Sequence, residues 1–294
     1  MACVQKWLNL ILVLYIFINL FNTTDGLQCQ DIENDVQINE EITSGRVKGL
    51  YSGFYKDIPV VLSYPADLEM RDDFKHGLQM LIDFQESGFV TELVGYCLDI
   101  KNLKMVTKYY KHGSLVNLDK ILEEFTSEEA WNKRLQLAVD YLSIIEFLHE
   151  KSRVMCDSSD LTKTLSQYLI TDDFRLVVND LDALPSVLNN QMIKCGHRQL
   201  FGEFVAPEQL WPHDDRPFLD EEMIGYDEKT DIWKMPNVLL FLLGRSALAT
   251  RTKVLLFELF GQCKNIEPAK RPSAKEVKQK LKDVLEGIRL KIEL

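Results

Sequence analysis

The chain has 294 residues, of which 46% are hydrophobic and 27% charged, so it can bury one large core or two lobes and is not a disordered polymer. Its 45 acidic and 34 basic residues give a net charge of −11, without a long Lys/Arg run. The summed field repels nucleic acid, so we expect no nucleic-acid partner, and any polyanionic ligand must be held by a few placed cations or metal ions.

An apolar segment at the N-terminus, WLNLILVLYIFINLF, covers residues 7–21 and is followed at once by polar NTTDG. Its length fits a signal-peptide core better than the roughly 20 residues of a spanning helix. However, bulky residues continue to Phe21 without a small-x-small cleavage site. A cleaved signal peptide and an uncleaved signal-anchor both stay open for residues 1–24, and in either case the rest of the chain is translocated.

Six cysteines occur, and five of them follow the apolar segment. No CxxC or Cys/His spacing indicates zinc, and a translocated chain makes disulfides the default. At least one of the five must be unpaired. We predict bridges between Cys29 and Cys97 and between Cys195 and Cys263.

The predicted elements change character along the chain. Residues 25–40 are acidic and polar without a strong period and are predicted to be a linker. The pattern then predicts, in order, strands at 46–55 and 58–64, a helix within 67–86, strands within 89–110, and helices from 112 onward, clearest at 130–150. This predicts an α+β domain at residues 41–290, with a small β-rich lobe at about 41–108 and a helical lobe at about 109–290.

Two aspartates are spaced as in the catalytic core of protein kinases. Asp157 follows His149 by eight residues, and Asp180, in the sequence DLD after the apolar run LVV, follows Gln167 by 13 residues. Further landmarks follow in the order that kinases use: Ala206-Pro207-Glu208, Asp231 with Trp233, and Arg271-Pro272. Five ordered landmarks over about 125 residues predict a bilobal protein-kinase-like fold.

These residue types suit phosphoryl transfer, in which a carboxylate accepts the hydroxyl proton and a metal held by a carboxylate and an amide spans the nucleotide phosphates. Asp157 is the predicted proton acceptor. Asp160 is the alternative, although it could equally be a cap or turn residue. Asp180 and Gln167 are the predicted ligands of Mg²⁺ or Mn²⁺. We assign structural roles to Asp231 and to Glu208 and Arg271, the last two as a buried ion pair.

Several residues that are usual in kinase motifs are replaced in this chain. The HRD motif reads Met155-Cys156-Asp157, and Ser63 stands where the lysine of the third strand belongs. The glycine-rich loop is reduced to SGRVKG, residues 44–49, in which Gly45 and Lys48 are the predicted ATP-binding residues. Lys48 is a candidate replacement for the lysine, because alternate strand residues share a face.

The partner of Lys48 stays open. Gly77 lies near the position of the usual helix glutamate, so Glu69, Asp72 and Asp73 are the alternatives. The Arg of HRD, with which many kinases sense phosphorylation, is replaced by Cys156, and Ser186 is the single hydroxyl residue between Asp180 and Glu208. We therefore predict that phosphorylation of this segment does not activate the protein.

The motifs RVMCDSSDL, NDLDALP, FVAPEQLWP and RVK before a strand that ends in Ser resemble those of the protein O-mannose kinase family, over roughly residues 45–285. The resemblance implies a single-pass type II protein of the endoplasmic reticulum membrane with a lumenal catalytic domain, and favours a signal-anchor. It implies transfer of the ATP γ-phosphate to the 6-hydroxyl of mannose in the trisaccharide GalNAc-GlcNAc-Man on α-dystroglycan. It also implies that Lys48 replaces the missing lysine.

Two other functions are weighed against this one. Ser63, Gly77 and the thinned glycine loop would also fit a catalytically inactive pseudokinase that binds the glycan or scaffolds glycosylation enzymes. A secreted protein kinase acting on Ser or Tyr is less favoured, because no peptide-recognition motif is visible.

Overall fold

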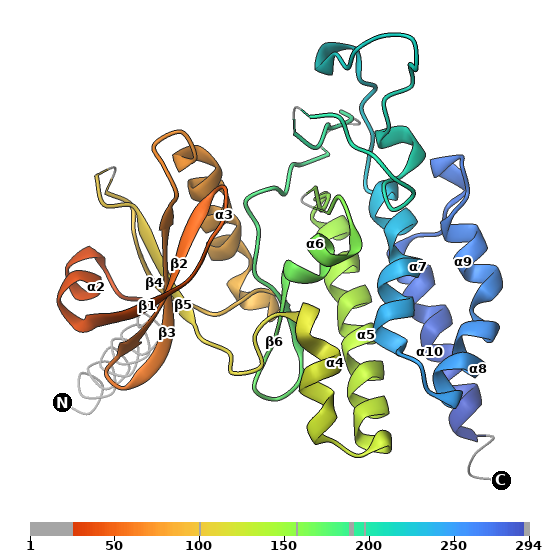
Figure 1. The fold of residues 1–294 in the computed structure, drawn as a ribbon, viewed down its shortest axis with the longest axis horizontal. Helices are drawn as coiled ribbons and strands as arrows, with labels where there is room; N and C mark the ends of the chain where they lie inside the picture. The colour runs from red at the N-terminus through yellow and green to blue at the C-terminus, as the bar shows by residue number, and fades with distance from the viewer. Residues whose placement is uncertain (1–25, 100, 157, 188–190, 197, 291–294) are drawn as a thin grey trace, which may run out of the picture. The chain divides into compact units, whose positions relative to one another are not determined.

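A computed structural model describes residues 26–99, 101–156, 158–187, 191–196 and 198–290, and the chain divides into two compact units (Figure 1). Unit 1 contains the described residues up to Lys75 together with Glu92–Tyr109, and unit 2 contains His76–Thr91 and the chain from Tyr110 onward. The predicted boundary near residue 108 is therefore close to the observed one, but residues 76–91 group with the helical unit.

Unit 1 is built on an antiparallel five-stranded sheet of order β1-β2-β3-β5-β4. Its strands are β1 (Val36–Ser44), β2 (Lys48–Tyr55), β3 (Ile58–Pro65), β4 (Leu93–Cys97) and β5 (Lys104–Lys108). Lys56 and Asp57 both have positive φ, which gives the tight turn between β2 and β3 the twist of the flanking strands. Val60, Leu62 and Val106 form the core of this sheet with Ile32.

The linker prediction for residues 25–40 is wrong, because this stretch contains helix α2 (Cys29–Asp35) and the start of β1. It reads as polar because every residue of β1 after Val36 is exposed, as befits an edge strand. The predicted disulfide between Cys29 and Cys97 is confirmed and ties α2 to β4.

Helix α3 (Arg71–Phe84) continues from unit 1 into unit 2. Its predicted apolar positions Phe74, Leu78 and Leu81 are buried, which confirms the helical period.

Unit 2 is mostly helical. Its α-helices after α3 are α4 (Leu118–Ile121), α5 (Ser127–Glu150), α6 (Leu161–Ser166), α7 (Lys229–Leu243), α8 (Ala247–Leu255), α9 (Phe257–Cys263) and α10 (Ala274–Leu290). A two-stranded sheet pairs β6 (Tyr168–Ile170) with β7 (Leu176–Val178). Short 3₁₀ turns cover Gln85–Ser87, Leu115–Asn117, Leu122–Glu124, Pro207–Gln209, Asp220–Glu222 and Pro268–Lys270.

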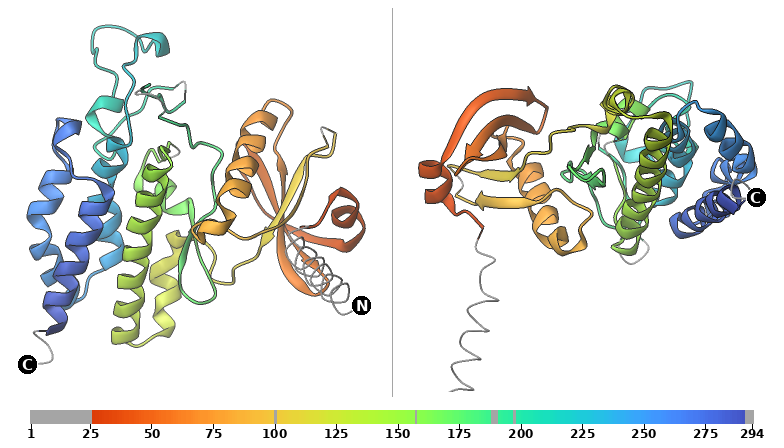
Figure 2. Two further views of the ribbon diagram at one scale, coloured as in Figure 1. Left: turned by 180° about the vertical axis from the view of Figure 1, so that it is seen from behind. Right: turned by 90° about the horizontal axis from the view of Figure 1, so that it is seen from below.

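Helix α5 is the centre of unit 2, and it lies beside α7 and α10 (Figure 2). It begins with a capping box in which Thr126 and Glu129 satisfy each other's backbone N–H groups. The helix buries apolar side chains on more than one face, including Leu137, Leu142 and Leu148. It is thus a core helix, against which α7, α10 and strand β7 pack.

Among the helices of the described residues, none combines the length and the apolar content that crossing a membrane requires. The predicted signal-anchor or signal peptide, residues 1–24, lies outside the described part of the chain.

A buried carboxylate fixes the small sheet to α5. Asp140, on α5, is 3% exposed and accepts hydrogen bonds from Arg175 Nε at 2.9 Å and Arg175 Nη2 at 2.8 Å. It also accepts one from the backbone N–H of Leu176, at 3.1 Å, where β7 begins. Since Asp180 lies two residues after the end of β7, this contact also positions the candidate site.

We predict that Arg175→Ala lowers the free energy of unfolding by about 2 kcal/mol, because it leaves the Asp140 carboxylate buried without its cation. Chemical denaturation measures this change. Arg251→Ala, on an exposed arginine, is the control and should change stability by less than about 0.5 kcal/mol. Equal effects of the two substitutions would contradict this role for Arg175.

Candidate active site

The loop of residues 155–167, here called the acceptor loop, carries the predicted proton acceptor. Asp157 itself lies outside the described residues, but both of its flanks are fixed. The N–H of Met155 donates to Asp231 Oδ2 at 3.1 Å, and the Ser158 hydroxyl donates to the Met155 carbonyl at 2.6 Å. Met155 and Ser158, on the two sides of position 157, are therefore both buried and hydrogen-bonded.

Asp231 supports this loop from α7, as its structural assignment predicted. Its carboxylate is 3% exposed, and Oδ2 also lies 3.2 Å from His149 Nε2 at the end of α5. One carboxylate thus joins α5, α7 and the start of the acceptor loop.

The acceptor loop is five residues longer between Asp157 and Gln167 than in the kinase motif H-R-D-x-x-x-x-N. The structure folds the additional residues into α6. Asp160 is the N-cap of this helix, and its Oδ1 accepts from the backbone N–H of Lys163 at 2.8 Å. Asp160 therefore has the capping role that its sequence context allowed.

The two predicted metal ligands come together at one end of the β6–β7 pair. Gln167 directly precedes β6, and Asp180 follows β7 by two residues. Tyr168 is opposite Val178, and the N–H of Asn179 donates to the carbonyl of Gln167 at 2.8 Å. The Gln167 side chain is fully buried, and its Nε2 donates to the Lys163 carbonyl at 3.0 Å, which fixes the orientation of the amide.

A carboxylate and an amide oxygen are ligand types that Mg²⁺ and Mn²⁺ accept. The donor set of Asp180 and Gln167 therefore fits the predicted metal. A group of three His, Cys, Asp or Glu side chains suited to a metal is not found within the described residues.

The segment after Asp180 runs antiparallel to the residues before Asp157. The N–H of Cys156 donates to the Ala183 carbonyl at 3.2 Å, and the N–H of Val154 donates to the Pro185 carbonyl at 3.3 Å. Ser186 forms an isolated bridge with Arg153. This strand-like pairing holds residues 183–187 in place through backbone hydrogen bonds.

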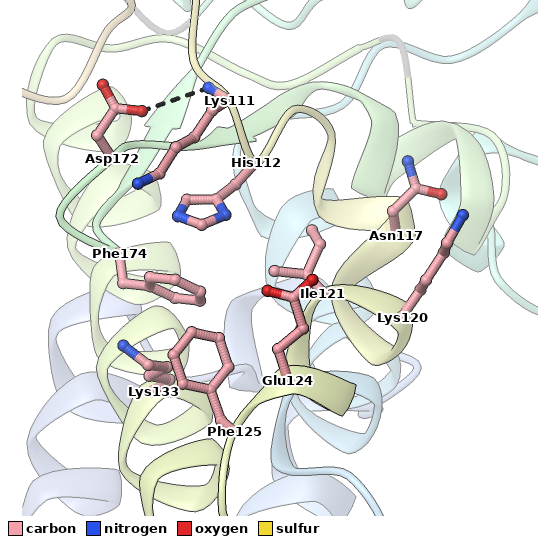
Figure 3. A pocket seen from close by; sticks show the side chains of 10 residues that line it. All are labelled: Lys111, His112, Asn117, Lys120, Ile121, Glu124, Phe125, Lys133, Asp172 and Phe174. Carbon is pink, nitrogen blue, oxygen red and sulfur yellow. Dashed lines mark hydrogen bonds between the residues drawn. The ribbon is translucent and has the colours of Figure 1, made fainter.

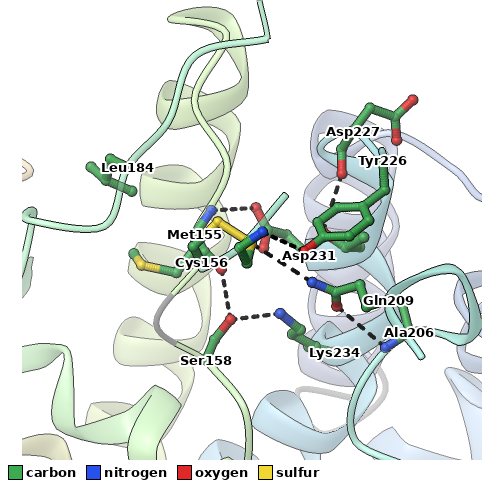
Figure 4. Close-up of a disulfide and its surroundings, with 12 residues drawn as sticks. Met155, Cys156, Ser158, Leu184, Ala206, Gln209, Tyr226, Asp227, Asp231 and Lys234 are labelled. Carbon is green, nitrogen blue, oxygen red and sulfur yellow. Dashed lines mark hydrogen bonds between the residues drawn. A yellow bond between two sulfur atoms is a disulfide. The ribbon is translucent and has the colours of Figure 1, made fainter. Parts of the chain in front are cut away.

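A disulfide joins Cys156 to Cys195 (Figure 4), so the predicted bridge between Cys195 and Cys263 is wrong. Its Cα atoms are 5.0 Å apart, and it crosses from the residue before Asp157 to a segment 39 residues later. Tyr226 supports Cys195, whose N–H donates to the tyrosine hydroxyl. The acceptor loop is therefore covalently tied to the chain between Asp180 and Glu208, here called the activation segment.

Cys263 is a free cysteine at the end of α9, and its side chain is fully buried. Burial raises the pKa of its thiol to about 12, so it is an unreactive core residue.

Lys234 is a buried cation under the acceptor loop. It belongs to α7, is 3% exposed, and its ammonium donates to the Ser158 hydroxyl at 2.6 Å (Figure 4). Burial lowers the pKa of Lys234, while the negative charges of Asp231 and Glu208 act in the opposite direction. This lysine holds the residue next to Asp157.

Gly77 permits a close approach between α3 and the DLD segment. A Cβ on Gly77 would lie 3.2 Å from both the Cα and the backbone N of Asp182. The neighbouring His76 places Nε2 3.2 Å from the Leu184 carbonyl. The absence of the usual helix glutamate therefore has a packing reason.

The ion pair between Glu208 and Arg271 is confirmed. Arg271 Nη1 and Nη2 contact the two carboxylate oxygens of Glu208 at 2.5 and 2.8 Å, and the arginine side chain is fully buried. This bidentate pair fastens the 3₁₀ turn Pro207–Gln209 to the segment before α10.

Lys48 and Gly45, the predicted nucleotide ligands, belong to unit 1 and are described within it. Leu50 is opposite Ser63 in the β2–β3 register, and Lys48 is two residues before Leu50. Because antiparallel partners share a face, and residues two apart do so as well, Lys48 projects from the same face as Ser63. The N–H of Gly45 donates to the Lys48 carbonyl at 2.9 Å, which closes the β1–β2 loop.

Three features of the site were missed at the sequence level. Asp160 before Leu161 and Leu165 is an N-cap followed by apolar residues at helical spacing, which could have indicated α6. Lys234 stands alone in the apolar run of α7, which could have indicated a buried cation. The pairing of Cys156 with Cys195 had no sequence signal.

A sheet-bearing unit, a helical unit and a carboxylate–amide pair beside the acceptor loop are consistent with a kinase-like fold and fit the kinase class of phosphotransferases.

Comparison with known proteins narrows this class. The chain is 45% identical over 276 residues to the protein O-mannose kinase of Homo sapiens, covering 91% of this chain and 78% of that one. It is 45% identical over 272 residues to the protein O-mannose kinase of Gallus gallus, covering 90% and 76%. No protein-family model matches the chain. The chain belongs to the protein O-mannose kinase family and is a phosphotransferase.

We predict that the Cys156→Ser/Cys195→Ser double variant lowers the free energy of unfolding by about 2–4 kcal/mol, because it frees a loop of 39 residues in the unfolded chain. Kinase activity should fall as well, since the acceptor loop loses its covalent support. Chemical denaturation and a phosphoryl-transfer assay measure the two effects. Cys263→Ala, which keeps both disulfides, is the control; activity equal to wild type in the double variant would contradict the role of the bridge.

We predict that Lys234→Met changes how stability depends on pH. The folded pKa of Lys234 lies below the ordinary value of 10.5, so between those two values the unfolded chain binds more protons than the folded chain. Wild-type stability should therefore gain, relative to the variant, as pH rises through that window. Denaturation of both proteins at several pH values, with exposed Lys280→Met as control, tests this; parallel profiles would show that Lys234 titrates normally.

Proposed function

We propose that this protein transfers the γ-phosphate of ATP to the 6-hydroxyl of mannose in the O-mannosyl trisaccharide GalNAc-GlcNAc-Man on α-dystroglycan, within a bilobal protein-kinase-like fold. The observation that carries the proposal is the juxtaposition of Asp180 and Gln167 at the end of the β6–β7 pair. Membership of the protein O-mannose kinase family supports the acceptor.

Asp157 accepts the proton of the mannose hydroxyl in this proposal. The alternative, Asp160, already uses Oδ1 as the cap of α6, which favours Asp157. Ser158, Met155 and the disulfide of Cys156 hold the backbone on both sides of that residue. The geometry of proton acceptance would thus be set before substrate binds.

Asp180 and Gln167 would hold Mg²⁺ or Mn²⁺. When bound, the metal neutralises charge on the nucleotide phosphates. The chain's own contribution is to fix the two ligands: Asp140 anchors β7, and the Lys163 carbonyl orients the Gln167 amide.

Lys48 would supply the cation for the nucleotide phosphates that the usual lysine of the third strand provides, and Gly45 would be a further ATP-binding residue. Its position on the face of the sheet that Ser63 shares supports this assignment. The lysine side chain is long and flexible enough to span the two strand residues between Lys48 and the position opposite Ser63.

The proposal includes a location in the endoplasmic reticulum membrane, as a single-pass type II protein anchored by residues 1–24 with a lumenal catalytic domain. Two disulfides within the described residues support an oxidising compartment.

The inactive pseudokinase is the second candidate function. Ser63 and Gly77 motivated it at the sequence level. The structure gives Gly77 a packing role against Asp182, so its lack of a carboxylate is not by itself a sign of lost activity.

We predict that the full chain in detergent, supplied with ATP, Mg²⁺ or Mn²⁺ and the trisaccharide, forms phosphorylated mannose, and that Asp180→Asn lowers kcat about 100-fold or more because the metal loses its carboxylate. Mass spectrometry and kinetics of the glycan product measure this. Asp283→Asn, on a surface helix, is the control that removes one carboxylate elsewhere.

Well-folded wild-type protein that binds the trisaccharide without forming product would establish the pseudokinase instead. Full activity of Asp180→Asn would refute the metal assignment.

A further inference from the structure

A cavity lies in unit 2, away from the candidate active site. It has a volume of about 780 Å³ and is formed by the segment before α4, by α4 itself, by the start of α5 and by the turn between β6 and β7 (Figure 3). Gln167 and Asp180 flank one end of the β6–β7 pair, whereas this turn closes the other end, three paired residues away. At roughly 3.3 Å per residue, the strands separate the two places by about 10 Å.

One residue that lines the cavity, Phe174, has an unfavourable backbone conformation. Phe174 has φ of 58°, in the left-handed region where a bulky residue is a genuine outlier. Glycine or asparagine would occupy this turn position with little strain. The turn is held by Thr171, whose hydroxyl accepts from the Arg175 N–H at 2.9 Å and whose N–H donates to the Arg175 carbonyl at 2.9 Å. Strain of this kind is often kept at functional sites.

The Phe174 ring is part of a cluster of cationic and aromatic groups. The His112 ring centroid is 4.3 Å from that of Phe174, and the Lys133 ammonium lies 3.8 Å from the Phe174 centroid. The ammonium is also 4.5 Å from the centroid of Phe125. Figure 3 shows the Phe174 ring between His112 and Lys133. The two phenylalanine rings thus hold the Lys133 ammonium in the lining of the cavity.

The cavity is more cationic than the rest of the chain. Lys111, Lys120 and Lys133 line it together with the carboxylates Glu124 and Asp172, in a protein whose net charge is −11. The backbone N–H of Lys111 donates to Asp172 Oδ1 at 3.3 Å, so that carboxylate also holds the rim of the cavity together. Burial lowers the pKa of His112, and the Lys111 ammonium lowers it further.

The mixture of lysines and carboxylates selects among ligand classes. A peptide with several acidic residues would meet repulsion from Glu124 and Asp172. A sugar with one anionic group can place that group on the lysines, while its hydroxyls donate to the carboxylates and to the Asn117 amide oxygen. Ile121, Phe125 and Phe174 can cover its apolar C–H face.

We propose that this cavity is a binding site for a sugar that carries one anionic group, a phosphate or a carboxylate. The site stands apart from the proposed phosphoryl transfer, since it shares no residue with the candidate active site. It would bind a negatively charged sugar at this cavity of unit 2, apart from Gln167 and Asp180 of the candidate active site in the same unit.

The experiment is isothermal titration calorimetry of the full chain in detergent with mannose 6-phosphate and with galacturonate, which separate phosphate from carboxylate as the anionic group. At least one should bind about tenfold or more tightly than neutral mannose and than inorganic phosphate. Lys133→Gln and Phe174→Gly should each weaken that binding about tenfold or more. Phe174→Gly suits the left-handed turn, so this variant is expected to fold.

Lys280→Gln removes the same charge from an exposed position of α10 and should leave affinity within about twofold. Equal affinity for inorganic phosphate and for the charged sugars would reduce the site to an anion site without sugar recognition and overturn the proposal. So would tighter binding of a glutamate hexapeptide, or affinity unchanged by Lys133→Gln and Phe174→Gly. Loss of kinase activity in Asp180→Asn with retained sugar binding would separate this site from the proposed reaction.

Discussion

The buried hydrogen-bonded support beneath the acceptor loop is the constraint on which the candidate site depends. Asp231 and Lys234 lie one helical turn apart on α7, each 3% exposed, and contact Met155 and Ser158 on the two sides of position 157. Removing two ionised groups from water is costly unless their hydrogen bonds are made in the folded state. The folded chain makes these bonds only when the loop has this course, so burial of α7 and placement of the loop are coupled.

The disulfide between Cys156 and Cys195 adds a covalent constraint to the same loop. Where many kinases use an arginine that responds to a phosphorylated activation segment, this chain joins the two segments permanently under oxidising conditions. Together with the backbone pairing of residues 152–156 with 183–187, this disulfide fixes residues 183–187 and Cys195 through contacts made on folding.

Other departures from the usual kinase motifs can be explained by local contacts in the structure. Gly77 lets α3 approach Asp182 where a Cβ would be in tight contact, at 3.2 Å. The residues added to the acceptor loop become α6, which follows the Asp160 cap and leads into Gln167 and β6. Lys48 shares a sheet face with Ser63, so the cation lost from one strand is present on its neighbour. Gly77, the lengthened acceptor loop and Ser63 are thus each accounted for by a neighbouring contact, helix or residue.

The sequence alone determined what depends on local order and spacing: the β-rich and helical halves, the apolar face of α3, the pair formed by Glu208 and Arg271, and the approach of Gln167 to Asp180 across a short hairpin. Tertiary structure decided what depends on which distant segments meet. It forms α2 and β1 where a linker was predicted. It pairs Cys195 with Cys156, leaves Cys263 buried and unpaired, and brings Lys234 to the hydroxyl of Ser158. Such contacts join residues with no shared period, so only packing of the complete chain can select them.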